Sequence, residues 1–170
     1  MTGVQTCALP ILSILTAWTA EALYKAWSAG VSNFFWYSLR DGRHEPGQPY
    51  SQSLESGLYF RGGPVEQDQP KEVLYVFRFP FVAFARKGGL FFWGRTPNSG
   101  PGKIRIEVMG KGGWRKAAVV QAGKSGVFKG ITERPYGIDK RGFARAVYAG
   151  EASVPFPMRR IGSFRHSPFG

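Results

Sequence analysis

The sequence is poor in cysteine, histidine and acidic residues. Its 170 residues include one cysteine and two histidines, and 11 acidic residues stand against 23 lysines and arginines, which gives a net charge of +12. One cysteine excludes an intrachain disulfide and a zinc site built from several cysteines. No apolar run reaches the roughly 18 residues of a membrane-spanning helix, since Thr16, Thr19, Glu21 and Lys25 interrupt the most apolar stretch. We therefore expect no membrane as a partner.

Apolar residues are abundant enough to form a core. Hydrophobic residues make up 43% of the chain and aromatic residues 15%. A chain of this composition can bury enough apolar surface to fold, so intrinsic disorder is not expected. Its length suits one or two small domains.

The first eleven residues differ in kind from the rest. Residues 1–11 have no basic region followed by a small-residue cleavage site, so they do not form a secretory leader. Residues 3–11 are instead similar to a sequencing adapter translated in frame, the alternative being a native loop. An adapter origin would make Cys7 foreign to the protein and would place the native N-terminus upstream.

For residues 12–89 the sequence predicts a helix, a strand, a long surface loop and a second helix, in that order. Apolar positions recur at helical spacing over residues 12–29, and Gly30 follows as a stop. The apolar run at 31–37 lacks alternation, which is typical of a strand buried on both faces of a parallel sheet. Residues 43–67 form a surface excursion rich in proline and glycine. A second helix is predicted over 71–79, with Asp68 as N-cap and Pro70 in its first turn.

Residues 90–170 indicate a small antiparallel β-sandwich. Short strands are predicted at 90–93, 103–108, 114–121, 126–132 and 143–148, with turn signals between them. In the clearest of them Ile104, Ile106 and Val108 alternate with charged residues and should point inward. Charge changes at the same place, near residues 86–89. Residues 1–89 hold 8 basic and 7 acidic residues, whereas residues 90–170 hold 15 and 4.

Several motifs occur in an order that resembles a known family. They are Glu21-Ala-Leu-Tyr-Lys-Ala-Trp-Ser-Ala-Gly-Val31, Phe35-Trp-Tyr-Ser-Leu-Arg-Asp41, Ser56-Gly-Leu-Tyr-Phe60, Asp68-Gln-Pro-Lys71 and Phe77-Arg-Phe-Pro-Phe81. Together they resemble the C-terminal end of bacterial glycoside hydrolases of the cellulase-like or xylosidase-like retaining kind, which have a (β/α)8 barrel. The resemblance implies an α/β plus all-β fold. Residues 12–89 would supply helix 7, strand 8 and helix 8 of an incomplete TIM barrel, and residues 90–170 the β-sandwich.

The resemblance also implies a substrate site. In such barrels the substrate lies at the carboxyl ends of the strands, so Trp36, Arg40 and Asp41 are the candidate substrate-binding residues. Trp36 would stack against a sugar ring; its alternative role is to fill the barrel interior. Asp41 either contacts a substrate hydroxyl or pairs with Arg40 or Arg43.

No catalytic residue is assigned to this chain. Retaining hydrolysis uses two carboxyl groups, and by resemblance these are glutamates upstream of Leu12. Glu21 reads as a surface charge, and Glu45 as a partner for a neighbouring arginine. His44 and His166 have no second ligand at metal spacing, so neither a metal nor another cofactor is expected.

Two functions follow from the sequence. The first is the C-terminal fragment of a secreted glycoside hydrolase, inactive alone, whose partners are a carbohydrate substrate and the missing N-terminal barrel portion. The second is a self-contained binding module in which the basic sandwich holds a polysaccharide or another polyanion. Nucleic acid is not the expected partner, since the basic residues are spread over many strands and turns. An ordinary solvated surface also accounts for their charge.

Overall fold

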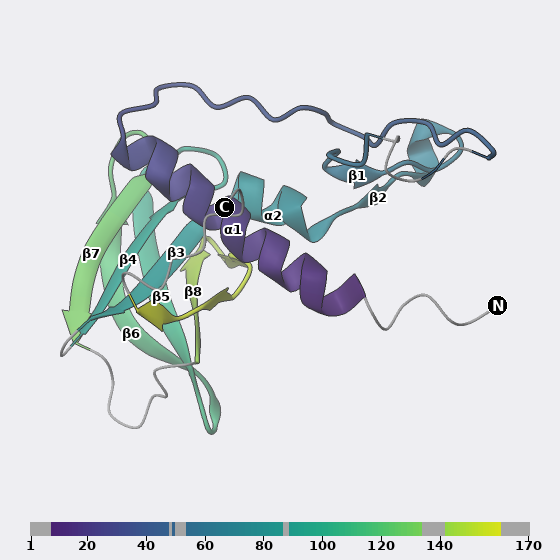
Figure 1. Ribbon diagram of the computed structural model, residues 1–170. Helices are drawn as coiled ribbons and strands as arrows, with labels where there is room; N and C mark the ends of the chain where they lie inside the picture. The colour runs from purple at the N-terminus through teal and green to yellow at the C-terminus, as the bar shows by residue number, and fades with distance from the viewer. Residues whose placement is uncertain (1–7, 48, 50–53, 87–88, 134–141, 161–170) are drawn as a thin grey trace.

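The computed structural model describes residues 8–47, 49, 54–86, 89–133 and 142–160. The described chain forms a β-sandwich with one long helix against it and a small separate lobe, formed by residues 38–47 and 54–71 (Figure 1). The helical elements are α1 (Ala8–Ser28), a 3-10 turn (Val65–Gln67) and α2 (Glu72–Arg78). The strands are β1 (Tyr59–Phe60), β2 (Gln69–Pro70), β3 (Phe81–Arg86), β4 (Gly89–Arg95), β5 (Gly102–Gly110), β6 (Gly113–Ala122), β7 (Val127–Glu133), β8 (Phe143–Tyr148), β9 (Glu151–Ala152), β10 (Phe156–Pro157) and β11 (Arg159–Arg160).

Two sheets form the sandwich. One has the order β10-β8-β5-β6, with β9 on β8, and the other has the order β11-β3-β4-β7. Every pairing within them is antiparallel except that of β11 with β3. A third sheet, β1 with β2, lies in the lobe. The predicted strands from residue 90 onward are confirmed, because β4 to β8 overlap all five of them.

The sandwich core follows from the alternation of side chains along the strands. Ile104, Ile106 and Val108 of β5 are fully buried, as predicted, and face the second sheet's Phe92 and Phe128 in the same hydrophobic cluster. At Gly94 the neighbouring strand of the same sheet leaves no room for a side chain, since a Cβ would lie 2.4 Å from the ring of Phe128, the cross-strand partner of Gly94 on β7. Burial of this layer removes large apolar side chains from water and stabilises the sandwich.

Helix α1 covers the outer face of the second sheet. Tyr24 lies 5.8 Å from Phe84, 5.8 Å from Phe91 and 5.5 Å from Trp93, and Trp27 lies 5.4 Å from Trp93, between ring centroids. Strand β3 is therefore buried on both faces, by the core on one side and α1 on the other. This explains why the strand shows no alternation in the sequence and was not predicted.

The end of α1 agrees with the sequence. Gly30 has a φ of +83°, its N–H donates to the carbonyl of Trp27, and the N–H of Val31 donates to the carbonyl of Ala26. This pair of bonds is a Schellman motif, which needs a left-handed residue at the position that glycine fills. The predicted stop at Gly30 is confirmed.

The prediction of an incomplete TIM barrel was wrong. Within the described residues there are two α-helices, the sheets are antiparallel apart from one short pairing, and no repeated strand-helix unit occurs. Residues 31–37, predicted as a buried parallel strand, belong to no sheet and are mostly exposed. A buried parallel strand needs hydrogen-bonded neighbours on both edges and helices on both faces. No such neighbours lie beside this segment in the described chain.

The start of α2 also differs from expectation. Helix α2 begins after Lys71, and Asp68 does not cap it. The Asp68 carboxylate accepts hydrogen bonds from Arg40 and from the N–H of Gly62 instead. Strand β3 lies on the N-terminal side of the expected boundary at residues 89 and 90, yet it pairs with β4 across it. Residues 1–7 of the suspected adapter, and His166, lie outside the described residues, whereas Ala8 begins α1.

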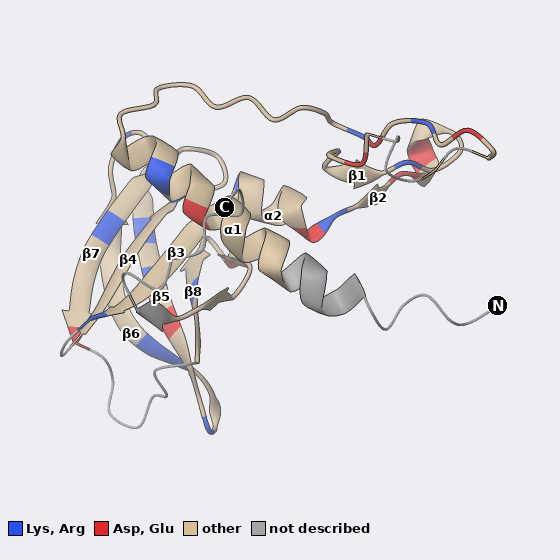
Figure 2. Ribbon diagram, in the orientation of Figure 1, with Lys and Arg blue, Asp and Glu red and all other residues tan. Residues whose placement is uncertain are grey.

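Charge is unevenly placed over the molecule (Figure 2). Lysines and arginines lie along the strands of the sandwich, whereas the lobe carries acidic and basic side chains together. In the part of the chain that the structure describes, neither helix combines the length and hydropathy needed to cross a membrane.

Replacing Tyr24 with alanine should weaken the whole fold. The half-buried ring packs on three aromatic side chains of the sheet, so its loss should lower the free energy of unfolding by about 2–3 kcal/mol. The matched control is Trp18→Ala on the same helix, which removes a ring that is 51% exposed and should cost less than about 0.5 kcal/mol. Urea denaturation measures both. Equal losses would show that α1 does not dock through Tyr24.

Candidate functional site

The segment after α1, residues 31–37, is the most exposed apolar part of the described chain. We call it the aromatic segment. Phe35 is 89% exposed, Tyr37 76% and Phe34 44%. In Figure 1 it runs from the end of α1 towards the lobe without joining a sheet. Because several exposed aromatic side chains gather in one stretch, this segment is a candidate binding surface.

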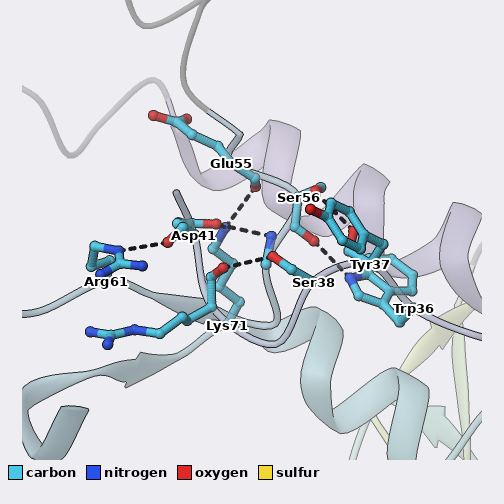
Figure 3. Close-up of polar contacts among 10 residues, drawn as sticks. Trp36, Tyr37, Ser38, Asp41, Glu55, Ser56, Arg61 and Lys71 are labelled. Carbon is cyan, nitrogen blue, oxygen red and sulfur yellow. Dashed lines mark hydrogen bonds and ion pairs between the residues drawn. The ribbon is translucent and has the colours of Figure 1, made fainter. Parts of the chain in front are cut away.

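Trp36 is the ring of this segment that a hydrogen bond anchors. Its Nε1 donates to the carbonyl of Ser56 at 2.7 Å, and its ring meets Phe77 edge-on at 5.8 Å between centroids. The hydroxyl of Ser56 donates to the carbonyl of Tyr37 at 2.9 Å. Figure 3 shows these contacts of Trp36 and Tyr37 with Ser56. They hold the indole half-buried, while Phe35 and Tyr37 stay exposed.

A buried ion pair organises the small lobe, which we define as residues 38–47 and 54–71. Lys71 Nζ lies 2.6 Å from Asp41 Oδ1, and both side chains are about 90% buried, with exposures of 8% and 10%. The same carboxylate oxygen accepts the N–H of Gly57, and Lys71 also donates to the carbonyl of Glu55. Figure 3 shows how these bonds converge on the loop at residues 55–57. The pair therefore sets the position of the loop that holds Trp36.

Arg40 occupies a second ion pair in the lobe. Its Nη2 lies 2.6 Å from Asp68 Oδ1, and its backbone forms a parallel bridge with Tyr59. The Arg40 Nε is buried and has no hydrogen-bond partner in the described part of the chain. Arg61 closes the cluster by donating from its Nε to the carbonyl of Asp41 at 2.7 Å.

Two cavities border these residues. The smaller, about 340 Å³, is lined by polar groups of the lobe, among them Asp41, His44 and Arg61. The larger, about 720 Å³, lies between the end of α1, the aromatic segment and the sandwich. Its walls include the rings of Trp27, Phe34, Phe77 and Trp93 with Arg78 and Arg95. That volume is within the usual range of small-molecule sites.

The three candidate residues from the sequence lie close together but have different surroundings. Trp36 and Asp41 both contact the loop at residues 55–57, whereas Arg40 pairs with Asp68. Asp41 pairs with Lys71 in the structure, while Arg43 forms an exposed pair with Glu45 at 3.4 Å. Sequence reasoning missed Lys71, Ser56 and Phe77. They are 16–41 positions away from their partners along the chain, and no local sequence pattern predicts a contact between residues so far apart.

The described residues do not form a cluster of side chains that could bind a metal ion. Among the described residues, no group of three histidine, cysteine, aspartate or glutamate side chains lies close enough to hold an ion. The carboxylates nearest the aromatic segment, Asp41 and Asp68, each serve a cationic partner.

A second polar cluster lies on the outer face of the first sheet of the sandwich. Glu107 accepts Arg105 Nε on one carboxylate oxygen at 2.7 Å and Arg145 Nε on the other at 2.8 Å. Burial by itself would raise the pKa of Glu107, but the hydrogen bonds and charges of Arg145 and Arg105 outweigh it and hold that pKa below its ordinary value of 4.5. Glu107 is therefore ionised at neutral pH.

Comparison of the chain with protein-family models, curated proteins and solved structures finds no match in any of the three. Any function must therefore be argued from the residues and their arrangement.

Asp41→Asn should loosen the small lobe. The substitution keeps the shape but leaves the buried Lys71 ammonium without its counter-ion, which typically costs 3–5 kcal/mol. We expect amide exchange at Gly57, whose N–H bonds to Asp41, to quicken by about 100-fold or more, with the sandwich unchanged. Exchange measured by mass spectrometry on peptides covering residues 54–61 gives the answer. Arg43→Gln, which breaks the exposed pair, is the control and should have no effect; unchanged exchange in Asp41→Asn would contradict the role of the pair.

Glu107 should make stability depend on pH in the acid range. Because its pKa is lowered in the folded protein, its contribution is complete above the unfolded value and disappears as the pH falls through the folded value. Wild type should therefore exceed Glu107→Gln in unfolding free energy at pH 7, and the difference should shrink as the pH falls below about 4.5. Urea titrations at pH 7, 5 and 3.5 test this. A difference independent of pH would contradict it.

Proposed function

We propose that this chain is the C-terminal part of a glycoside hydrolase, and that its aromatic segment contacts the carbohydrate substrate. The observation that carries the proposal is the run of aromatic rings at residues 34–37, exposed at Phe34, Phe35 and Tyr37, beside a cavity lined by further aromatic rings. The order of motifs that resembles retaining glycoside hydrolases supports it. The proposal does not include the barrel, which the fold excludes for the described residues.

Aromatic rings suit this role because a pyranose presents an apolar face of C–H groups. Packing such a face on a ring contributes about 1 kcal/mol beyond the area buried, by analogy with pairs of aromatic rings. Phe35 and Tyr37 offer exposed rings, and Trp36 is held half-buried between them by Ser56 and Phe77. Arg40 and Asp41 would act mainly by fixing the lobe from which this surface projects, through their ion pairs with Asp68 and Lys71.

The chemistry of hydrolysis would come from elsewhere in the protein. A retaining mechanism needs two carboxyl groups about 5–5.5 Å apart, one as nucleophile and one as acid and base. Asp41 and Asp68 are engaged with Lys71 and Arg40, so neither suits these tasks. The catalytic glutamates would lie in a preceding part of the protein, and this chain by itself would not hydrolyse glycosides. Secretion to the extracellular space follows from the same proposal.

Binding of neutral oligosaccharides tests the aromatic segment. We expect the full chain to bind xylohexaose or cellohexaose weakly, with the double variant Phe35→Ala/Tyr37→Ala reducing the association constant about tenfold through loss of two ring contacts. Titration calorimetry provides the measurement. Tyr75→Ala, which removes a ring of α2 that is 47% exposed, is the matched control and should leave binding unchanged. If neither sugar binds, or if the control loses as much affinity as the double variant, the proposed contact between the aromatic segment and the carbohydrate is wrong.

Catalysis is tested separately. The full chain should release no product from aryl xylosides or aryl glucosides, and the coding sequence upstream of Leu12 should encode a region that restores cleavage when joined to it. A rate from the chain alone that disappears in Trp36→Ala would contradict the assignment of the catalytic glutamates.

A further inference from the structure

The outer face of the β6-β5-β8 sheet gathers cations around one carboxylate. Glu107 lies at its centre, paired in register with Lys116 of β6 on one side and Arg145 of β8 on the other. Arg105 precedes Glu107 by two residues on β5, and Lys103 precedes Arg105 by two, so all lie on the same face. We call this set the basic face: Lys103, Arg105, Glu107, Lys116 and Arg145. Four cationic groups against one carboxylate leave it with an excess of three positive charges.

Glu107 holds the two guanidinium groups in place. The Glu107 side chain is 10% exposed and accepts a hydrogen bond from the Nε of each arginine. These two bonds fix the orientation of both guanidinium groups. Within the described residues, no hydrogen bond uses the Nη atoms of Arg105 or Arg145. Arginine presents its donors as a planar fork that matches a carboxylate. The two forks are therefore ordered in advance of any ligand.

Apolar side chains lie among the cations. Val119 of β6, opposite Arg105, is 55% exposed, and Phe143 of β8, two residues before Arg145, is 46% exposed. The Trp114 ring is covered by the Arg145 guanidinium at 4.2 Å. The face thus combines fixed positive charge with apolar patches on a sheet.

We propose that the basic face binds an acidic polysaccharide through its carboxylate groups. The excess positive charge complements a polyuronate, the two arginine forks suit carboxylates, and the exposed Val119 and Phe143 can contact the C–H groups of the sugar rings. Single-stranded nucleic acid is a poorer fit, because it binds on several open aromatic faces and Trp114 has a ring face occupied by Arg145. This site is separate from the aromatic segment, so it goes beyond the function proposed above.

The test uses polygalacturonate with the full chain. Lys103→Gln/Lys116→Gln removes two exposed cations from the face, and Lys124→Gln/Lys129→Gln removes two exposed cations from a turn and from the other sheet. Both variants lose the same charge and leave the Glu107 pairs intact. Affinity electrophoresis at low and high salt, with xylohexaose and single-stranded DNA as further probes, compares them.

We expect polygalacturonate to bind at low salt and to be released at high salt, since exposed charges are screened. The first double variant should bind it about tenfold more weakly, whereas the second should change binding less than twofold. Absence of polygalacturonate binding at low salt, an equal loss in both variants, or tighter binding of DNA would overturn the proposal. Xylohexaose binding should be the same in both variants, so failure of this site is distinguishable from failure of the aromatic segment.

Discussion

The packing of Tyr24 and Trp27 against Phe84, Phe91 and Trp93 joins the N-terminal helix to the sandwich, and the rest of the structure depends on it. It gives the second sheet a cover on its outer face and makes β3 a strand with no exposed side before Arg86. It also places the last turn of α1 against the second sheet, through Trp27 and Trp93. From that end, at Gly30, the aromatic segment leaves the sandwich and carries its exposed rings towards the lobe.

Two kinds of charge pairing serve different purposes. In the small lobe, Asp41 with Lys71 and Arg40 with Asp68 satisfy charges that are largely out of water, and their geometry fixes loops. Breaking such a pair costs more than the pair contributes over an apolar substitute. On the basic face, Glu107 has two arginines and leaves positive charge in excess. The first arrangement suits a structural role, and the second suits a surface that meets an anion.

The two proposed binding surfaces differ in chemistry. The aromatic segment offers rings and little charge, which suits neutral sugars, whereas the basic face offers ordered cations with apolar patches, which suits an acidic polymer. A protein that held an acidic polysaccharide on one surface and a neutral one on another could act on material in which both occur. The two surfaces share no residue, since one is residues 31–37 and the other lies on β5, β6 and β8, so each can be altered separately.

The sequence by itself determined the five strands β4 to β8 and the end of α1. Alternation at Ile104, Ile106 and Val108 and the left-handed stop at Gly30 are local signals, and local signals survive folding. Only the tertiary structure decided the surroundings of the remaining elements. An apolar run without alternation has the same appearance whether it is buried on two faces, as in β3, or exposed, as at residues 31–37. Likewise Asp41 could not be assigned to Lys71, 30 positions away, because the choice of partner depends on which parts of the chain meet in space.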